Sequence, residues 1–205
     1  PLSEGLSGVS LSANWMWPCN NEGENARLYE AVRSVSDFSI ALGINVPTGK
    51  DSLSMKQRYP EGDVLAPGTI VISAVAQCSN INQVVEPVIQ PMAGGLYYIN
   101  LSQDSYKLGG SSWAQTQNAL GSETPDVRNA QLLAQAFNQL QSWIAQGIIA
   151  SGHDIGSGGL ITTLLEWCFA QPGAGAHVDL SPLEGSLIPV LFAENTGLVF
   201  QLSSD

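Results

Sequence analysis

The first strong periodic signal along the chain is helical, because apolar side chains recur three or four positions apart. Leu28, Val32 and Val35 follow this spacing after a polar stretch, and Phe38 extends the same stripe. Gly43 comes directly after the pattern, at the position where a glycine commonly ends a helix. The spacing therefore predicts an amphipathic helix that ends at Gly43.

The sequence on either side of this helix favours strands and loops. Residues 1–22 have no clean period, so we expect them to be mostly irregular. Residues 44–47 read as a short strand that runs into a loop over 48–55. Residues 68–77 are rich in β-branched side chains and lie between turn residues, which is typical of a strand.

The second half of the chain alternates between strand-like and helix-like segments. The pattern predicts strands over 95–101, 148–151, 177–180 and 198–202. It also predicts a short helix that opens at 109–112 and runs to about residue 119. A longer helix is expected from an N-cap at Asp126 to Gly147, and another follows a glycine-rich turn with Leu160, Leu164 and Trp167 facing inward.

Alternating strands and helices indicate an α/β (α+β) fold. Residues 82–93 contain two prolines and no clean period, so we expect a boundary between domains there. The resulting division has one domain over 1–84, a linker over 85–93 and a second domain over 94–205. The first domain has few strands and the second ends just after an apolar strand, so we expect both to be truncated.

Composition changes this picture in one respect, which is the shortage of charge. Charged residues make up 12% of the 205 residues, whereas soluble domains carry about 25%. Charged side chains are the ones least tolerated in buried surface, so the shortage indicates that other domains cover part of this chain. We therefore expect a piece of a larger protein, with exposed strand edges that favour self-association.

Charge, hydropathy and cysteine content exclude several classes of protein. The net charge of −11 argues against a broad nucleic-acid-binding face, which needs clustered Lys and Arg. No apolar run reaches the roughly 20 residues of a membrane helix, and no leader sequence is recognisable. The three cysteines (Cys19, Cys78 and Cys168) are widely spaced, which favours reduced thiols in a cytoplasmic protein over a disulfide scaffold or a zinc site.

The first segment with candidate chemistry is Gly49-Lys50-Asp51-Ser52, expected in the loop that follows a strand. Glycine lets backbone N–H groups approach an anion, and Lys50 can neutralise phosphate. Asp51 can hold Mg²⁺ and Ser52 can hydrogen-bond an oxygen ligand. The spacing is not that of a Walker P-loop, so a polar glycine-containing turn without a ligand remains an equal alternative.

The second segment is His153–Leu160, which joins a strand to a helix through a glycine-rich turn. Backbone donors at the positive end of a helix suit phosphate, and Asp154 is a hard oxygen ligand of the type that Mg²⁺ uses. His153 would orient Asp154 through a hydrogen bond. The alternative is a tight turn in which Asp154 is only the N-cap of the helix. No strained GxSxG sequence is present, so a serine hydrolase is not expected.

Four strings in order carry a resemblance to a known family. They are Leu11–Met16 (LSANWM), Gly23–Tyr29, Val46–Lys56 (VPTGKDSLSMK) and His153–Leu160 (HDIGSGGL). Together they resemble the large single-chain phosphoribosylformylglycinamidine synthases, also called formylglycinamide ribonucleotide amidotransferases, over essentially the whole chain. The first and third strings argue against other proteins of the same fold, such as a kinase or a hydrogenase-maturation factor.

The resemblance implies a fold and an activity. The fold would be aminoimidazole ribonucleotide synthetase-like, with the end of a second N-domain and most of a C-domain that has a mixed sheet and flanking helices. The activity would be an ATP- and glutamine-dependent ligase of purine biosynthesis, which converts formylglycinamide ribonucleotide to the amidine. The partners would be small-molecule substrates and other domains of the same polypeptide, namely a first synthetase-like half and a glutaminase domain.

The resemblance also assigns residues. Gly49, Lys50, Asp51 and Ser52 would line a nucleotide and ribonucleotide site, and family N-domains pair across a barrel-like interface. Asp154 would be a Mg²⁺ ligand of an auxiliary ATP or ADP site. Gly156 replaces a serine that usually contacts this nucleotide, so only its backbone N–H is available there.

Two interpretations follow for the chain itself. One is that it forms part of the ligase and is inactive alone, because it lacks the glutaminase residues and the other catalytic half. The alternative is a non-catalytic module that supplies an interface and holds an auxiliary Mg²⁺-nucleotide.

Overall fold

The computed structural model describes residues 1–204, which form two compact units. One unit is Leu2–Ser79 and the other begins at Asn80. Among the described residues, no helix combines the length and apolar character needed to cross a membrane. The three cysteines are free thiols.

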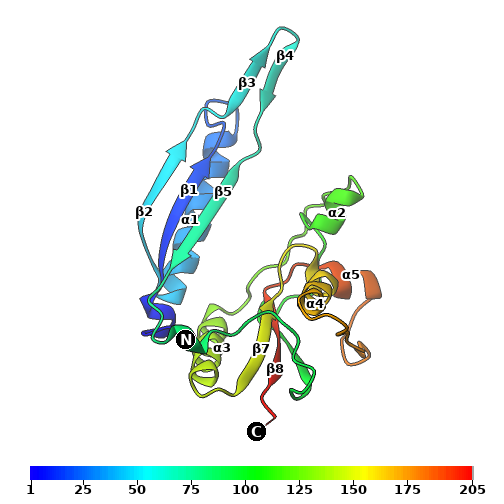
Figure 1. Cartoon of the computed structure of the whole chain (residues 1–205). Coiled ribbons are helices and arrows are strands. Elements are labelled where there is room, and N and C mark those ends of the chain that lie inside the picture. The colour runs from blue at the N-terminus through cyan, green and yellow to red at the C-terminus, as the bar shows by residue number, and fades with distance from the viewer. Residues whose placement is uncertain (205) are drawn as a thin grey trace. The chain divides into compact units, whose positions relative to one another are not determined.

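The first unit is a three-stranded sheet with one long helix. Strands β1 (Ser10–Met16), β2 (Asn45–Ser52) and β5 (Thr69–Val75) lie in the order β2-β1-β5. Strand β1 pairs parallel with β2 and antiparallel with β5, so this sheet is mixed. Helix α1 (Glu24–Leu42) runs along the sheet, and a short 3-10 helix (Gly5–Gly8) precedes β1 (Figure 1). A hairpin of β3 (Lys56–Tyr59) and β4 (Gly62–Leu65) extends beyond the sheet.

Helix α1 ends as predicted, and Leu28 and Val35 of the predicted stripe are half-buried. Gly43 adopts the left-handed conformation, and its N–H caps the last turn. Ser39 is the buried position of the helix, whereas Val32 and Phe38 are 42% and 38% exposed. Ser39 lies four positions after Val35 and continues the predicted stripe, whereas Phe38 lies at its exposed margin.

Two predictions in this unit were wrong. Residues 10–16 were expected to be irregular but form the central strand β1. Residues 48–52 were expected in a loop but continue β2, because their backbone pairs with β1 in register Asn14 to Lys50 and Trp15 to Asp51. Both strands depend on partners more than 30 positions away in the sequence, which no local pattern reveals.

The second unit is a three-layer arrangement around an antiparallel sheet. Strands β6 (Leu96–Asn100), β7 (Ile149–Asp154) and β8 (Gly197–Leu202) lie in the order β6-β8-β7. All their pairs are antiparallel, in contrast to the mixed sheet expected for this domain. The helices are α2 (Ser112–Thr116), α3 (Ala130–Ala145), α4 (Gly159–Phe169) and α5 (Leu187–Phe192), and a 3-10 turn covers Ile81–Gln83. Figure 1 shows α3 and α4 on opposite sides of β7 and β8.

Each face of strand β8 belongs to a separate apolar cluster. Val199 is fully buried in one cluster, with Leu160, Leu164 and Trp167 of α4. Phe200 lies in the other, with Leu140 of α3 and Ile149. The strand alternates its side chains between the two faces, so one strand fills both cores.

Three further differences from the sequence-based expectations concern this unit. Asn129, and not Asp126, caps α3, since its side chain accepts a hydrogen bond from the Leu132 N–H. Residues 177–180 form no strand. Ile89, within the expected linker, is buried against Trp167, and the structural division falls after Ser79. The domain limits at 84 and 94 stay a prediction.

A buried carboxylate fastens the loop after β6. Asp104 accepts hydrogen bonds from Lys107 Nζ at 2.7 Å, Arg128 Nη2 at 3.1 Å and the Asp126 N–H at 3.0 Å. These partners, led by Lys107, hold the pKa of the Asp104 carboxyl well below its usual range. The Asp126 segment therefore anchors this loop instead of capping the helix.

The β8 core gives a stability test with a control on the same helix. Trp167 is 1% exposed and Phe169 is 74% exposed, although both belong to α4. We expect Trp167→Ala to lower the free energy of unfolding by about 3–5 kcal/mol, because it leaves a large cavity. Phe169→Ala should cost less than about 1 kcal/mol. Urea denaturation of the full chain measures both, and equal losses would contradict this account of the core.

Candidate functional site

The first candidate segment lies on strand β2, so its side chains alternate between two faces of the sheet. Lys50 and Ser52 share one face, and Lys50 Nζ hydrogen-bonds Ser52 Oγ. Asp51 belongs to the opposite face and pairs in register with Trp15. The structure therefore joins the cation with the hydroxyl and separates both from the carboxylate.

The close pairing of two strands explains why position 49 is a glycine. A Cβ atom at this position would lie 2.2 Å from the backbone carbonyl oxygen of Ala13 on the neighbouring strand. Glycine is therefore required for the close pairing of β1 with β2, whether or not an anion binds here. This contact places the backbone of Lys50 and Asp51 firmly in the sheet.

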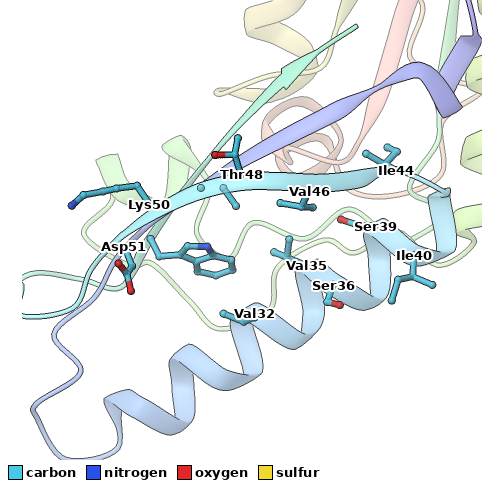
Figure 2. A pocket seen from close by; sticks show the side chains of 13 residues that line it. Val32, Val35, Ser36, Ser39, Ile40, Ile44, Val46, Thr48, Lys50 and Asp51 are labelled. Carbon is cyan, nitrogen blue, oxygen red and sulfur yellow. The ribbon is translucent and has the colours of Figure 1, made fainter.

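A pocket of about 560 Å³ lies between α1 and strands β1 and β2. Figure 2 shows Val32, Val35 and Ile40 of the helix on one side and Val46 on the other. Lys50 and Asp51 lie at one end of the pocket (Figure 2). Apolar walls with charged groups at one end suit an organic ligand that carries a polar substituent.

The second candidate segment begins at the end of β7. The Asp154 side chain is 79% exposed, and its Oδ1 lies 3.4 Å from His153 Nδ1. His153 Nδ1 is also 2.8 Å from the Asp154 carbonyl oxygen, and its Nε2 is 3.6 Å from Glu166 Oε2. The imidazole thus lies between two carboxylates, but its hydrogen bond is to the backbone carbonyl of Asp154 and not to the side chain that it was expected to orient.

The structure rules out Asp154 as the N-cap of α4. The N-cap residue is Gly158, with a φ of 88°, and no side chain of the turn caps the helix. Instead, the Gly158 N–H donates to Glu194 Oε1 at 2.8 Å. No local motif marks Glu194 in the sequence, because its partner lies 36 positions away.

The three glycines of the turn differ in whether a side chain would fit at their positions. A Cβ at Gly158 would meet Thr162 Oγ1 at 2.3 Å, and one at Gly159 would meet the Leu191 carbonyl oxygen at 2.7 Å. Both also have positive φ, so packing and backbone conformation explain them. Gly156 has nothing within 4 Å of an added Cβ and is open on that side.

Asp154 is the group here that suits a divalent metal ion. Within residues 1–204, no three His, Cys, Asp or Glu side chains are grouped as metal ligands would be. Mg²⁺ is often bound through one or two carboxylates together with water and phosphate oxygens. A single exposed carboxylate fits this pattern, with the remaining ligands supplied by water, phosphate or other segments of the protein.

A second pocket lies beside Asp154, within the layer between α3 and the sheet. It has a volume of about 360 Å³ and is walled mainly by Phe137, Leu140, Ile149 and Phe200. Gln141, His153 and Asp154 are the polar side chains that line it. The exposed carboxylate thus stands next to an apolar cavity.

Both units match described protein families. Residues 2–77 match the FGAR-AT PurM_N-like domain, and residues 101–203 match the AIR synthase related protein, C-terminal domain. The second match covers half of the chain. The chain belongs to the AIR synthase related family. The family resemblance read from the sequence is confirmed, as is the α/β fold of synthetase-like type.

Curated relatives align with nearly the whole of this AIR synthase related chain. It is 39% identical over 203 residues to the probable phosphoribosylformylglycinamidine synthase, chloroplastic/mitochondrial, of Arabidopsis thaliana, and 40% identical over 199 residues to the phosphoribosylformylglycinamidine synthase of Homo sapiens. These alignments cover 97% and 96% of the chain. The chain spans only 14% and 15% of those relatives' own length.

Solved structures agree on the fold. PurL of T. maritima, complexed with FGAR, aligns with a TM-score of 0.62 at 13% identity, over 97% of this AIR synthase related chain and 32% of PurL. The hydrogenase maturation protein HypE, in complex with ATP, aligns with a TM-score of 0.61 at 17% identity, over 97% and 59%. At these identities the likeness shows the fold alone.

The glycine turn yields a paired test. We expect Gly159→Ala to lower the free energy of unfolding by more than about 2 kcal/mol, because its Cβ clashes with backbone at positive φ. Gly156→Ser should change it by no more than about 0.5 kcal/mol, since the position is open. Chemical denaturation of the two variants measures both values, and a large loss in Gly156→Ser would show that the turn is packed more tightly than described.

Proposed function

We propose that this chain is part of an ATP- and glutamine-dependent ligase of purine biosynthesis. The ligase converts formylglycinamide ribonucleotide to formylglycinamidine ribonucleotide. The observation that carries the proposal is the 39–40% identity, over nearly the whole chain, to two proteins named phosphoribosylformylglycinamidine synthase. PurL structures with ATP, ADP and FGAR share the fold, which supports nucleotides and a ribonucleotide as ligands.

We propose further that Gly49, Lys50, Asp51 and Ser52 contribute to the nucleotide and ribonucleotide site. Lys50 and Ser52 point from the same face of β2, so an ammonium and a hydroxyl donor can both reach one phosphate group. Asp51 lies on the other face, at the end of the α1 pocket, where its carboxylate accepts hydrogen bonds from hydroxyl or amino groups. The strand thus separates anion binding from hydrogen-bond acceptance.

At the second site we propose that Asp154 binds Mg²⁺ of an auxiliary ATP or ADP. Its carboxylate is exposed, and the imidazole of His153 lies 3.4 Å from it. The Gly156 N–H replaces the hydroxyl that a serine would supply to the nucleotide. The bound metal would neutralise phosphate charge. The Asp154 carboxylate is the one oxygen ligand that this chain would supply to the metal.

Other domains of the same polypeptide are the partners that this proposal requires. The chain spans about one seventh of its curated relatives, and Asp154 alone does not complete a metal site. We therefore propose that the chain by itself is inactive and works with a first synthetase-like half and a glutaminase domain, in the cytoplasm. A coupled assay in which this chain alone forms the amidine from formylglycinamide ribonucleotide, ATP and glutamine would overturn the proposed inactivity of the chain.

A non-catalytic role is the second candidate, and the Asp154 site favours it. That site consists of one exposed carboxylate beside a glycine-rich turn. In this interpretation the Mg²⁺-nucleotide bound to the second unit stabilises the fold, while residues of β2 bind the substrates of the reaction. Variants at the two sites separate these roles.

The β2 site is tested by Lys50→Ala in the intact enzyme that carries this chain. Loss of a charged hydrogen bond to phosphate is worth about 1.5–3 kcal/mol, so kcat/KM should fall roughly 10- to 100-fold. Arg33→Ala is the control, because Arg33 is an exposed cation of α1 outside the pocket. Phosphate release in steady state measures both variants. Equal, small effects would remove Lys50 from the proposed site.

The Asp154 site is tested by Asp154→Asn in the same enzyme. Wild-type enzyme should gain thermal stability with added Mg²⁺-ADP, because a ligand that binds only the folded state stabilises it. The variant should lose most of this gain while its turnover changes less than threefold. Glu184→Gln, an exposed acid of the same unit, should keep the gain. A variant that melts and responds like wild type would contradict a metal role for Asp154.

A further inference from the structure

Glu194 accepts hydrogen bonds from two helix starts at once. Its Oε1 atom is 2.8 Å from the Gly158 N–H, at the start of α4, and 2.8 Å from the Ser112 N–H, in the first turn of α2. These donors lie 46 positions apart in the sequence. One carboxylate oxygen therefore ties the glycine-rich turn to a second turn, Gly109–Ser111.

The helix starts need such an acceptor. The first N–H groups of a helix have no partner within it, and the aligned peptide dipoles make this end electropositive. Helix α4 has no side-chain cap of its own, and the cap of α2, Ser111, is used on the Ala114 N–H. The negative charge of Glu194 thus lies where both helices favour an anion.

The fold holds Glu194 firmly in this place. Its neighbours Ala193 and Asn195 are both buried, and the Asn195 amide donates to Ser102 Oγ at 2.9 Å and to the Ser105 carbonyl oxygen at 3.2 Å. A Cβ at Gly159 would lie 2.8 Å from the Ala193 carbonyl oxygen, so α4 begins in direct contact with this backbone. Glycine at 159 therefore allows the approach that brings Glu194 to the helix start.

We propose that Glu194 is a positioning residue that fills, from within the chain, the anion position at the start of α4. The Gly158–Gly159 part of the glycine-rich turn then has a structural role, because it binds Glu194. A ligand phosphate can reach the turn only from the side of Asp154 and Gly156. This corrects the expectation that the helix start itself receives phosphate. The inference goes beyond the proposed ligase function and holds whether or not a nucleotide binds.

Anion rescue in the full chain tests this proposal. Glu194→Ala should lower the melting temperature by on the order of 5 °C, because two N–H donors and two helix dipoles lose their acceptor. Sodium formate or phosphate should restore part of this loss in a saturable way, relative to sodium chloride of equal ionic strength. Such rescue by a small anion is not expected if Glu194 only fills space.

Two further variants serve as controls. Glu194→Gln keeps an acceptor oxygen but no charge, so it should melt between wild type and Glu194→Ala and show little rescue by formate. Glu166→Ala removes an exposed carboxylate of the same helix that makes no contact with the helix start, and it should show no rescue. Any gain from phosphate at the proposed β2 site is common to wild type and the variants, so rescue is measured as the gain of Glu194→Ala above that of wild type.

Two results would overturn the proposal. One is a gain from formate or phosphate in Glu194→Ala no larger than that in wild type, which would mean that removing Glu194 opens no anion position at the helix start. The other is an unchanged melting temperature in Glu194→Ala. Should this variant fail to fold, amide hydrogen exchange of wild type decides: the Gly158 and Ser112 amides should be protected without any added anion, and fast exchange at both would overturn the proposal.

Discussion

The second unit depends on the alternation of side chains along a single strand, β8. Val199 points to the α4 layer and Phe200 to the α3 layer, so consecutive residues of one strand build two cores. Strand β8 also pairs on both sides, with β6 and with β7. A shift of one residue in its register would exchange the contents of both cores, so the register is fixed strongly.

The same strand positions both sides of the glycine-rich turn. Leu198 pairs with Asp154, which sets where β7 ends and where the exposed carboxylate lies. Glu194 and Asn195 come directly before β8 and are delivered to the start of α4. The candidate metal ligand and the internal carboxylate are therefore both positioned by β8 or the residues just before it.

The first unit has no comparable strand with two packed faces. Its sheet of three strands leaves Val71, Ile72 and Val75 of β5 exposed, and α1 leaves Tyr29 and Ile40 exposed. Exposed apolar surface of this kind, together with the low proportion of charged residues, agrees with the proposal that other domains cover the chain. The candidate segment Gly49–Ser52 lies in the same sheet, so its environment in an intact enzyme would include groups from those domains.

Local sequence patterns were sufficient where an element depends on its own residues. The α1 spacing with Gly43 at its end, the apolar run of β5 and the helix after the glycine turn were all predicted from neighbouring side chains. The strings Leu11–Met16 and Val46–Lys56 were sufficient for the family, because they are specific in combination. Chain composition by itself indicated that the surface is partly covered.

Only the tertiary structure decided features that depend on distant backbone. The central strand β1 and the extension of β2 to Ser52 exist because each pairs with the other, which places Lys50 and Asp51 on opposite faces of a sheet. Glu194 became visible only when folding brought it 2.8 Å from two N–H groups distant in sequence. The sequence by itself determined which residues can carry chemistry, whereas hydrogen bonds between remote segments decided which of them meet, because such pairing leaves no periodic trace along the chain.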